Sequence, residues 1–302
     1  MSERKTIGIL FDRVRWEEKE LGRQLEIRGV SYDMIDAKSQ VLPLDRSDIP
    51  SLPQTVLERC VSFYRGLNLS SVFEAHGIRT INSSRILDVC GNKLMTSQIL
   101  AKNGVPTPRT VVAFSAEAAM QAVEQIGFPC VMKPIVGSWG RQVVPIRDHE
   151  TAEALIEMRE QQNDSMQTIF YIQEMIKRPP RDIRCIAVGE EIVASVYRYA
   201  SPENWKTNVA LGGHSEPCKV TPELEETILK TVKVIGEGVL GIDLMEKPDS
   251  ELVVHEVNGT VEFKGAQTAT DYSIAARIID YVTSDRATKH RKSRPVDIPA
   301  GQ

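Results

Sequence analysis

Oxygen-bearing side chains occur together on two short apolar runs in the last third of the chain. Glu256 and Asn258 lie two residues apart within residues 253–258, and alternate side chains of a strand share one face. Asp243 lies on the preceding run, and pairing of the two runs around residues 248–250 brings it opposite them. Two carboxylates and an amide oxygen suit Mg²⁺, which keeps its other positions for water and phosphate. The pattern predicts a magnesium site at Asp243, Glu256 and Asn258, and hence phosphoryl-transfer chemistry.

A second pattern suits phosphate binding. Lys133 ends an apolar run and is followed by a glycine-containing loop. A lysine there delivers a point charge into a cleft, and backbone N–H groups of the loop can close over phosphates. The loop fits neither GxxxxGK[ST] nor GxGxxG, and a stretch of this kind, taken alone, is more often an ordinary turn beside a solvated lysine. The nucleotide-contacting loop residues predicted here are Gly137, Ser138, Trp139, Gly140 and Arg141.

A connector and the strand after it supply the next candidates. The sequence Lys-Arg-Pro-Pro at residues 177–180 predicts a crossing between subdomains, where backbone groups can read an adenine edge, although an ordinary connector is equally compatible. Asp182 and Arg184 alternate on one strand face, so both can enter one cleft. Arginine suits bidentate recognition of phosphate or carboxylate, and a surface ion pair is the alternative. The predicted adenine segment before the connector is Gln173, Glu174, Met175 and Ile176.

Further positive charge flanks a loop that leads to two glycines at 212–213. Positive charge near a transferred phosphoryl group stabilises charge that develops in the transition state. Catalytic roles are therefore predicted for Arg184, Arg198 and Lys206. Asn208 flanks the same loop, and the family resemblance described below implies that it contacts the nucleotide. The five histidines have no metal-ligand spacing and no GxSxG motif occurs, so neither a zinc site nor a covalent nucleophile is expected. His255 is expected to point away from Glu256.

The elements that must position these residues fall into two classes. Strand–helix alternation in the first 84 residues indicates a small parallel α/β domain, and residues 110–176 read as an α+β unit. Glycine and proline after residue 103 end a helix that starts near residue 92. The sequence predicts strands at 6–11, 32–35, 60–62, 111–113 and 130–134, and helices at 16–28, 69–76, 92–103, 115–126, 151–161, 222–236 and 274–282.

Bulk properties narrow the class of protein. The chain has 302 residues, 41% hydrophobic and 26% charged, with a net charge of −4, which is ordinary globular composition for two or three structural units and not that of a general nucleic-acid binder. No apolar run approaches the length of a membrane span. Five scattered cysteines without an evident signal segment predict reduced thiols in a cytoplasmic protein.

Taken in order, these residues resemble the motif set of the ATP-grasp superfamily. The resemblance implies an ATP-grasp fold of mixed α/β and α+β class, in which two α+β subdomains hold ATP and an N-terminal pre-ATP-grasp α/β domain precedes them. It places Lys93 and Lys133 on the phosphates, the segment after Gln173 on adenine, Asp182 on ribose, and Mg²⁺ on the three oxygen ligands. The implied domains are 1–88, 89–176 and 177–285, followed by a disordered basic tail at 286–302.

Short segments at 11–19, 74–78, 90–94, 104–108, 256–258 and 262–264 are most similar to the RimK/LysX branch, and within it to the aminoadipate–LysW ligases. This implies that ATP activates the C-terminal glutamate γ-carboxyl of the small acidic carrier protein LysW as an acyl phosphate. The α-amino group of 2-aminoadipate then attacks, in lysine biosynthesis. A homodimer or homotetramer is implied, with Arg13, Arg15, Lys19 and Arg141 facing the carrier. The implied substrate contacts are Arg198, Val209, Ala210, Glu262, Phe263, Lys264, Gly265 and Ala266.

Two departures from the branch pattern concern specificity. Leu211 stands where an arginine is common, and Gly265-Ala266 matches neither the Asn-plus-small pair of aminoadipate enzymes nor the Gly-Phe pair of glutamate enzymes. Ala266 leaves room for the longer aminoadipate, but one methylene discriminates by only ~1–3 kcal/mol. A glutamate–LysW ligase of arginine biosynthesis, a dual-specificity enzyme and a RimK-like glutamate ligase are therefore alternatives. A nucleotide-binding regulator without chemistry and an unrelated α/β scaffold are alternatives of another class.

Overall fold

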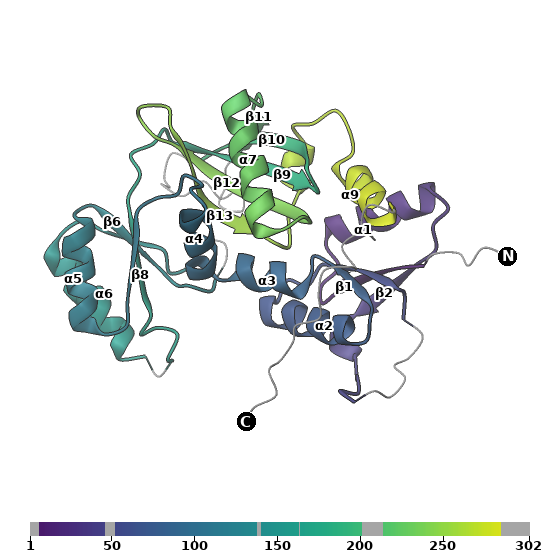
Figure 1. Ribbon diagram of the computed structural model, residues 1–302, viewed down its shortest axis with the longest axis horizontal. Coiled ribbons are helices and arrows are strands. Elements are labelled where there is room, and N and C mark those ends of the chain that lie inside the picture. The colour runs from purple at the N-terminus through teal and green to yellow at the C-terminus, as the bar shows by residue number, and fades with distance from the viewer. Residues whose placement is uncertain (1–5, 46–51, 138–139, 163, 201–213, 285–302) are drawn as a thin grey trace.

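A computed structural model describes residues 6–45, 52–137, 140–162, 164–200 and 214–284 of the chain. These residues form three sheets flanked by helices (Figure 1). Among them, no helix combines the length and the apolar character needed to cross a membrane.

The N-terminal sheet is parallel, with strand order β2-β1-β3-β4. The strand predicted at 60–62 is wrong, because the third strand is the apolar-centred run Thr55–Glu58. Residues 61 and 62 instead form a bend whose backbone N–H groups donate to the Asp12 carboxylate. The elements are β1 (Ile7–Phe11), α1 (Trp16–Ile27), β2 (Tyr32–Asp36), η1 (Ala37–Ser39), β3 (Thr55–Glu58), α2 (Phe63–Ala75) and β4 (Arg79–Ile81).

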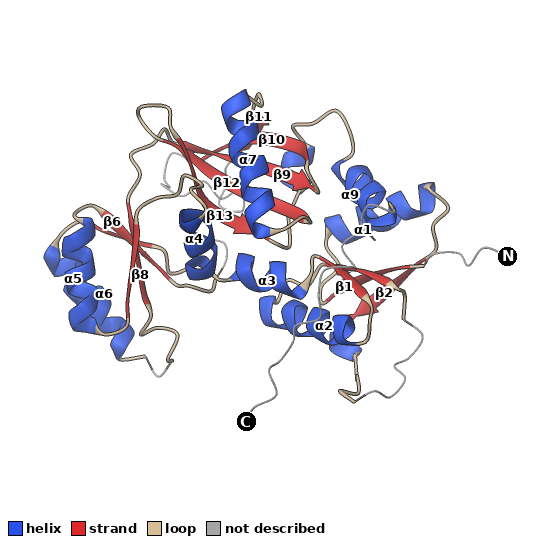
Figure 2. Ribbon diagram, viewed as in Figure 1, coloured by secondary structure: helices blue, strands red, loops and turns tan. Residues whose placement is uncertain are grey.

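Two helices lead from this domain to the second sheet. Asn92 ends the first helix and caps the second, accepting hydrogen bonds from the N–H groups of Leu94 and Met95. The second sheet is antiparallel, with order β5-β8-β6-β7, and two helices pack on its apolar face (Figure 2). The elements are α3 (Ser84–Gly91), α4 (Lys93–Lys102), β5 (Thr110–Ala113), α5 (Ala116–Ile126), β6 (Cys130–Lys133), β7 (Val144–Ile146), α6 (His149–Glu160) and β8 (Phe170–Glu174).

The third sheet has order β11-β10-β9-β12-β13, and β12 and β13 form the predicted hairpin. Alternate residues of β9 face two cores: Cys185 and Ala187 pack towards α7, whereas Ile186 and Val188 pack towards α9. The elements are β9 (Arg181–Val188), β10 (Glu191–Tyr199), β11 (His214–Pro217), α7 (Pro222–Ile235), β12 (Val239–Glu246), β13 (Leu252–Asn258), α8 (Lys264–Gln267) and α9 (Ile274–Thr283).

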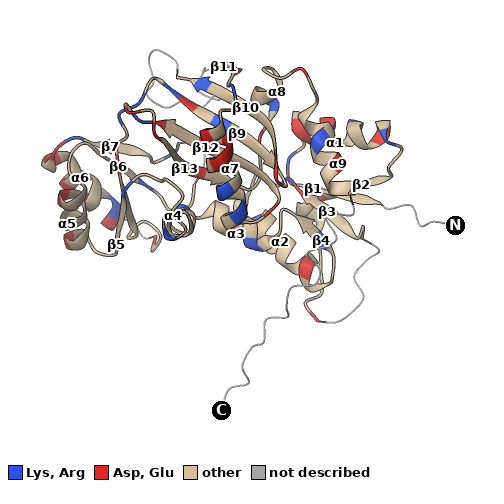
Figure 3. Ribbon diagram, turned by 45° about the horizontal axis from the view of Figure 1, so that its top comes forward, with Lys and Arg blue, Asp and Glu red and all other residues tan. Residues whose placement is uncertain are grey.

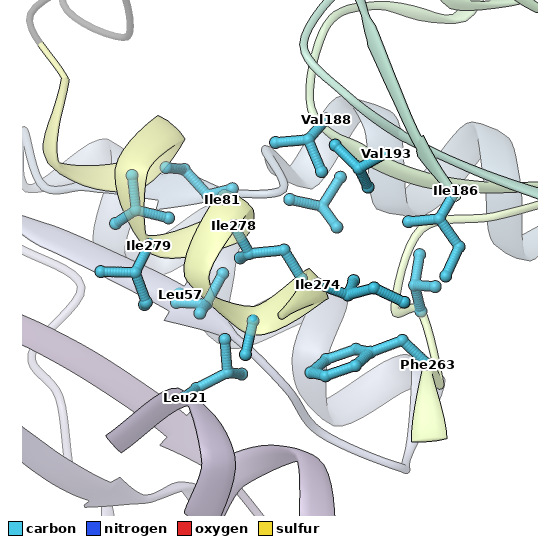
Figure 4. Close-up of a cluster of buried hydrophobic side chains, with 14 of the residues drawn as sticks. Leu21, Leu57, Ile81, Ile186, Val188, Val193, Phe263, Ile274, Ile278 and Ile279 are labelled. Carbon is cyan, nitrogen blue, oxygen red and sulfur yellow. The ribbon is translucent and has the colours of Figure 1, made fainter. Parts of the chain in front are cut away.

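Helix α9 joins the first and third sheets through a shared core. Ile274 and Ile278 of this helix lie between apolar side chains of the N-terminal domain and those of the third sheet (Figure 4). The buried cluster includes Leu21, Leu57, Ile186, Val193 and Phe263.

Candidate nucleotide and metal site

A pocket of about 430 Å³ lies between the second and third sheets and is also lined by the segment that joins β8 to β9. This volume is in the range of small-molecule sites. Thirteen residues predicted from the sequence line it: Lys93, Lys133, Gly137, Gly140, Arg141, Gln173, Glu174, Met175, Ile176, Asp182, Arg198, Asp243 and Glu256.

Two lysines from different elements enter this pocket. Lys133, at the end of β6, is 8% exposed, and its Nζ donates to Gln173 Oε1 at 2.6 Å. Lys93, the first residue of α4, donates to the Gly137 carbonyl at 2.7 Å and lies 3.2 Å from Glu256 Oε1. Burial lowers the pKa of Lys133 to about 8. The structure thus brings together the two cations predicted for phosphate binding.

The three predicted magnesium ligands lie close together on the β12–β13 hairpin. Asp243 pairs in register with Glu256, and Asn258 pairs with Gly241. The Asn258 amide nitrogen is 3.4 Å from Asp243 Oδ2. Burial raises the pKa of Glu256, but the nearby charges, led by Lys93, outweigh it and bring the pKa down to about 2. Glu256 is therefore an anion at neutral pH.

His255 does not point away from the site as expected. The register shifts between Asp243 and Leu244, which leaves His255 as the extra residue of a bulge. Strict alternation fails there, and His255 lines the pocket together with Glu256. Its Nε2 is buried and has no hydrogen-bond partner among the described residues. Burial lowers the pKa of His255 to about 3, so the ring is neutral.

Cross-strand ion pairs hold the acidic groups of β9 and β12. Arg184 is ion-paired with Asp243, with Nη2 2.9 Å from Oδ2. Arg198 donates to both Asp182 oxygens at 2.8 Å and lies 3.2 Å from Asp243 Oδ2. Asp182 is only 2% exposed, so its carboxylate holds Arg198 here, although the resemblance places it on ribose. Arg184 contacts Asp243 and is not among the lining residues.

These donors fit a magnesium ion by their chemistry. Asp243 Oδ1 is buried and accepts no hydrogen bond from the described residues, although Arg184 lies against it. In the part of the chain that the structure describes, no three His, Cys, Asp or Glu side chains gather as a metal site. The predicted set has only two carboxylates, and its third ligand is an amide. A magnesium ion bound here would use the Asp243 and Glu256 carboxylates, the Asn258 amide oxygen, and water or phosphate oxygens.

The predicted substrate run 262–266 lies against the N-terminal domain and outside the pocket lining. Phe263 is fully buried and packs edge-on against Trp16, with ring centroids 5.7 Å apart. Ala266 is 5% exposed in the same core. Glu262 is ion-paired with Arg15 at 3.0 Å. Lys264 is exposed and begins α8, which also contains Gly265. The sequence does not predict this helix, because it has only four residues.

Arg15 is one of the basic residues predicted to face the carrier. Its side chain is only 16% exposed, and it is also ion-paired with Glu18. Arg13 and Lys19 are exposed. Figure 3 shows acidic and basic positions side by side on α1, so this helix has a mixed charge.

Arg178 and His255 are among the residues that line the pocket but are not among the thirteen predicted from the sequence. Arg178 lines the pocket, and its guanidinium donates to the Arg181 carbonyl at 2.6 Å. Its position in the Lys-Arg-Pro-Pro connector is the feature of the sequence that could have indicated this role. Seven residues of the sequence predictions lie outside the described residues, as does the tail at 286–302: Ser138, Trp139, Lys206, Asn208, Val209, Ala210 and Leu211.

Comparisons with known proteins cover nearly the whole chain. Residues 90–282 match the RimK-like ATP-grasp domain, and residues 7–89 match the LysX preATP-grasp domain. The glutamate–LysW ligase ArgX of Sulfurisphaera tokodaii is 41% identical over 91% of this chain and 97% of its own length. The alpha-aminoadipate–LysW ligase LysX of the same organism is 36% identical over 90% and 96%.

Solved structures share the fold at low identity. A RimK domain ATP-grasp protein from Sphaerobacter thermophilus superposes with a TM-score of 0.77 and 20% identity, covering 92% of this chain and 100% of its own. D-alanine–D-alanine ligase from Bacillus anthracis, solved with ATP, has a TM-score of 0.68 and 18% identity, covering 96% and 99%.

Proposed function

Because the chain belongs to the RimK-like ATP-grasp family, we propose that it ligates a carboxylate of a LysW-type carrier protein to the α-amino group of an acidic amino acid. The observation that carries the proposal is the composition of one pocket. Lys93 and Lys133 enter it together with the carboxylates of Asp243 and Glu256. ATP-grasp ligases use ATP and Mg²⁺, and this arrangement of cations and oxygen ligands suits both.

The proposed reaction has two steps. A carboxylate oxygen of the carrier attacks the γ-phosphorus of ATP, the bond to ADP breaks, and an acyl phosphate forms. The amino group of the amino acid then attacks the acyl carbon, the C–O bond to phosphate breaks, and the nitrogen loses a proton as the amide forms. No covalent bond to a protein side chain is needed in either step.

The side chains of the pocket act by position and charge. Lys93 and Lys133 bind and orient the phosphates, and the Asp182 carboxylate aims the Arg198 guanidinium into the pocket. When bound, magnesium neutralises charge on the phosphate oxygens. The backbone of Met175 and Ile176, beside Arg178, borders the adenine. The Glu174 side chain is less available for a contact with adenine, because its Oε1 accepts a hydrogen bond from the Arg109 N–H at 2.7 Å.

Of the two candidate amino acids, we place glutamate first. Two glutamate–LysW ligases share 41% and 38% identity with this chain, whereas three aminoadipate–LysW ligases share 34% to 36%. The sequence predicts that Ala266 leaves space for 2-aminoadipate, yet the Ala266 side chain packs in the core between α8 and α9. Its small volume therefore does not directly lengthen the substrate site.

The second candidate is 2-aminoadipate, the substrate predicted from the sequence, and the absence of phenylalanine at position 266 is the feature that favours it. An enzyme specific for glutamate would serve arginine biosynthesis, and an enzyme specific for 2-aminoadipate would serve lysine biosynthesis.

A competition assay distinguishes the candidates. The protein is incubated with ATP, Mg²⁺, a LysW-type carrier and equal concentrations of glutamate and 2-aminoadipate, and the carrier is weighed intact by mass spectrometry. A glutamate ligase gives mainly the lighter adduct, with a ratio of about tenfold or more. An excess of the heavier adduct supports 2-aminoadipate, and equal amounts indicate dual specificity. ADP release without any adduct contradicts the proposed function.

A further inference from the structure

A buried hydrogen-bond network lies behind Lys133 and involves Gln173. The Lys133 ammonium donates to Gln173 Oε1 at 2.6 Å. The Gln173 amide nitrogen donates to Thr110 Oγ1 and to the Tyr171 hydroxyl, both at 2.9 Å. The Tyr171 hydroxyl is in turn 2.7 Å from Ser97 Oγ. The network thus joins β6, β8, β5 and α4.

The orientation of the Gln173 amide is fixed by its partners. A lysine ammonium can only donate, so the atom that faces Lys133 must be the carbonyl oxygen. The amide nitrogen then faces two hydroxyl oxygens, which can accept. Gln173 is 2% exposed and Tyr171 is 1% exposed, so a reversed amide would leave buried groups without partners, at a high energetic cost.

The network also reaches the element that carries the second phosphate-binding lysine. Ser97 and Lys93 are four residues apart in α4, so they lie on the same face of that helix. One chain of contacts therefore connects the strand that ends at Lys133 with the helix that begins at Lys93.

We propose that Gln173 is a positioning residue that fixes the Lys133 ammonium for the nucleotide phosphates, through the hydrogen bonds that Thr110, Tyr171 and Ser97 supply. This replaces the adenine contact predicted for Gln173 from the sequence. A lysine side chain has several rotatable bonds, and fixing it before the ligand arrives lowers the entropy lost on binding. This proposal rests on the proposed function only in one respect, which is that the pocket binds a nucleotide.

Direct binding measurements test the inference without carrier or amino acid. Calorimetric titrations with Mg-ADP and with adenosine compare wild type, Gln173→Met and Gln161→Met. Gln161 is exposed at the end of α6 and provides a matched control. Gln173→Met should weaken ADP binding about ten- to a hundredfold, as expected for a lost hydrogen bond to a charged group. Adenosine binding should stay within about threefold, because adenosine has no phosphates.

Two further variants keep the inference testable if Gln173→Met unfolds. Tyr171→Phe removes one support of the Gln173 amide and should weaken ADP binding less than Gln173→Met, again without affecting adenosine. In a Lys133→Met background, Tyr171→Phe should not weaken ADP binding further, because the Lys133 ammonium that the network positions is absent.

The inference is overturned if the Gln173 and Tyr171 variants weaken adenosine and ADP equally, which would indicate an adenine contact or general unfolding. It is also overturned if their effects persist in the Lys133→Met background. Wild type that binds ADP but fails to modify any carrier would contradict the proposed ligase and leave this inference intact.

Discussion

The acidic side chains of the pocket are neutralised by basic side chains in or directly beside it. Asp243 lies against Arg184 and Arg198, and Glu256 lies against Lys93. Removing one member of such a pair leaves a buried charge without a partner. Single substitutions here therefore affect both ligand binding and folding, and each needs a stability control.

Glu256→Gln should raise the magnesium concentration needed for half-maximal turnover by about tenfold to a hundredfold or more, because one anionic oxygen ligand becomes a neutral amide. Magnesium titrations of ADP release measure this. Glu251→Gln is the matched control, since Glu251 lies on the same hairpin and pairs with Lys247 near the surface. An unchanged magnesium requirement in Glu256→Gln would exclude Glu256 as a ligand.

Nucleotide affinity should depend on pH through Lys133. Burial depresses its pKa from 10.5 to about 8, so between these values the folded chain binds fewer protons than the unfolded chain. Lys133 therefore makes the fold more stable as pH rises through this window. The same proton loss removes the charge that attracts phosphates, so the dissociation constant of Mg-ADP should rise by up to about tenfold per pH unit above about 8. Lys133→Met should lose this dependence; a rise of equal steepness in that variant would assign the effect to another group.

At the scale of elements, regular patterns were predictable and local irregularities were not. The helices at α1, α5, α7 and α9 were predicted to within a few residues, because long amphipathic segments with caps carry a strong signal. Period-2 alternation correctly placed Glu256 and Asn258 on one hairpin with Asp243. The same rule failed at His255, because a bulge depends on the pairing of two strands and has no mark in a single sequence.

Helix α8 gives a prediction about residue 266. Ala266→Phe places a large ring into a core already filled by Phe263 and α9, so the free energy of unfolding should fall by about 1–3 kcal/mol. Urea denaturation measures it. Lys264→Ala, at an exposed position of the same helix, should change it by less than about 0.5 kcal/mol. A changed amino-acid preference with unaltered stability would show that residue 266 contacts substrate directly.

At the scale of the whole molecule, the N-terminal domain contacts the ends of the two strands that carry the predicted magnesium ligands. Asn82, after β4, exchanges hydrogen bonds with the backbone of Val239 at 2.7 and 2.8 Å and also donates to the Gly259 carbonyl. Val239 begins β12, and Gly259 directly follows Asn258. Thr260 donates to the buried Glu58 carboxylate at 2.7 Å. None of these contacts between distant segments could be predicted from the sequence alone.

Asn82→Ala should destabilise the protein by about 1–3 kcal/mol for each buried backbone group left unpaired, because Asn82 is only 3% exposed. The free energy of unfolding in urea is the measurement. Asn103→Ala, which removes an exposed amide at the end of α4, serves as the control. Equal stability of the two variants would mean that Asn82 does not join the domains.

The predicted ATP-grasp fold with its N-terminal pre-ATP-grasp domain is confirmed by the family matches and the fold comparisons. That prediction depended on the order of short motifs along the chain, which is visible in a sequence. The domain boundaries and individual residue roles stay predictions, since they depend on bound ligands and on pairings across the pocket.

The central claim is that ATP activates a carboxylate of the carrier as an acyl phosphate. Its most direct test uses a LysW-type carrier with ¹⁸O in the reacting carboxylate, together with ATP, Mg²⁺ and glutamate. Because the carboxylate oxygen that attacks the γ-phosphorus later leaves with the phosphate, we expect one ¹⁸O atom in each phosphate released alongside modified carrier. Unlabelled phosphate, formed in step with the modified carrier, would contradict it.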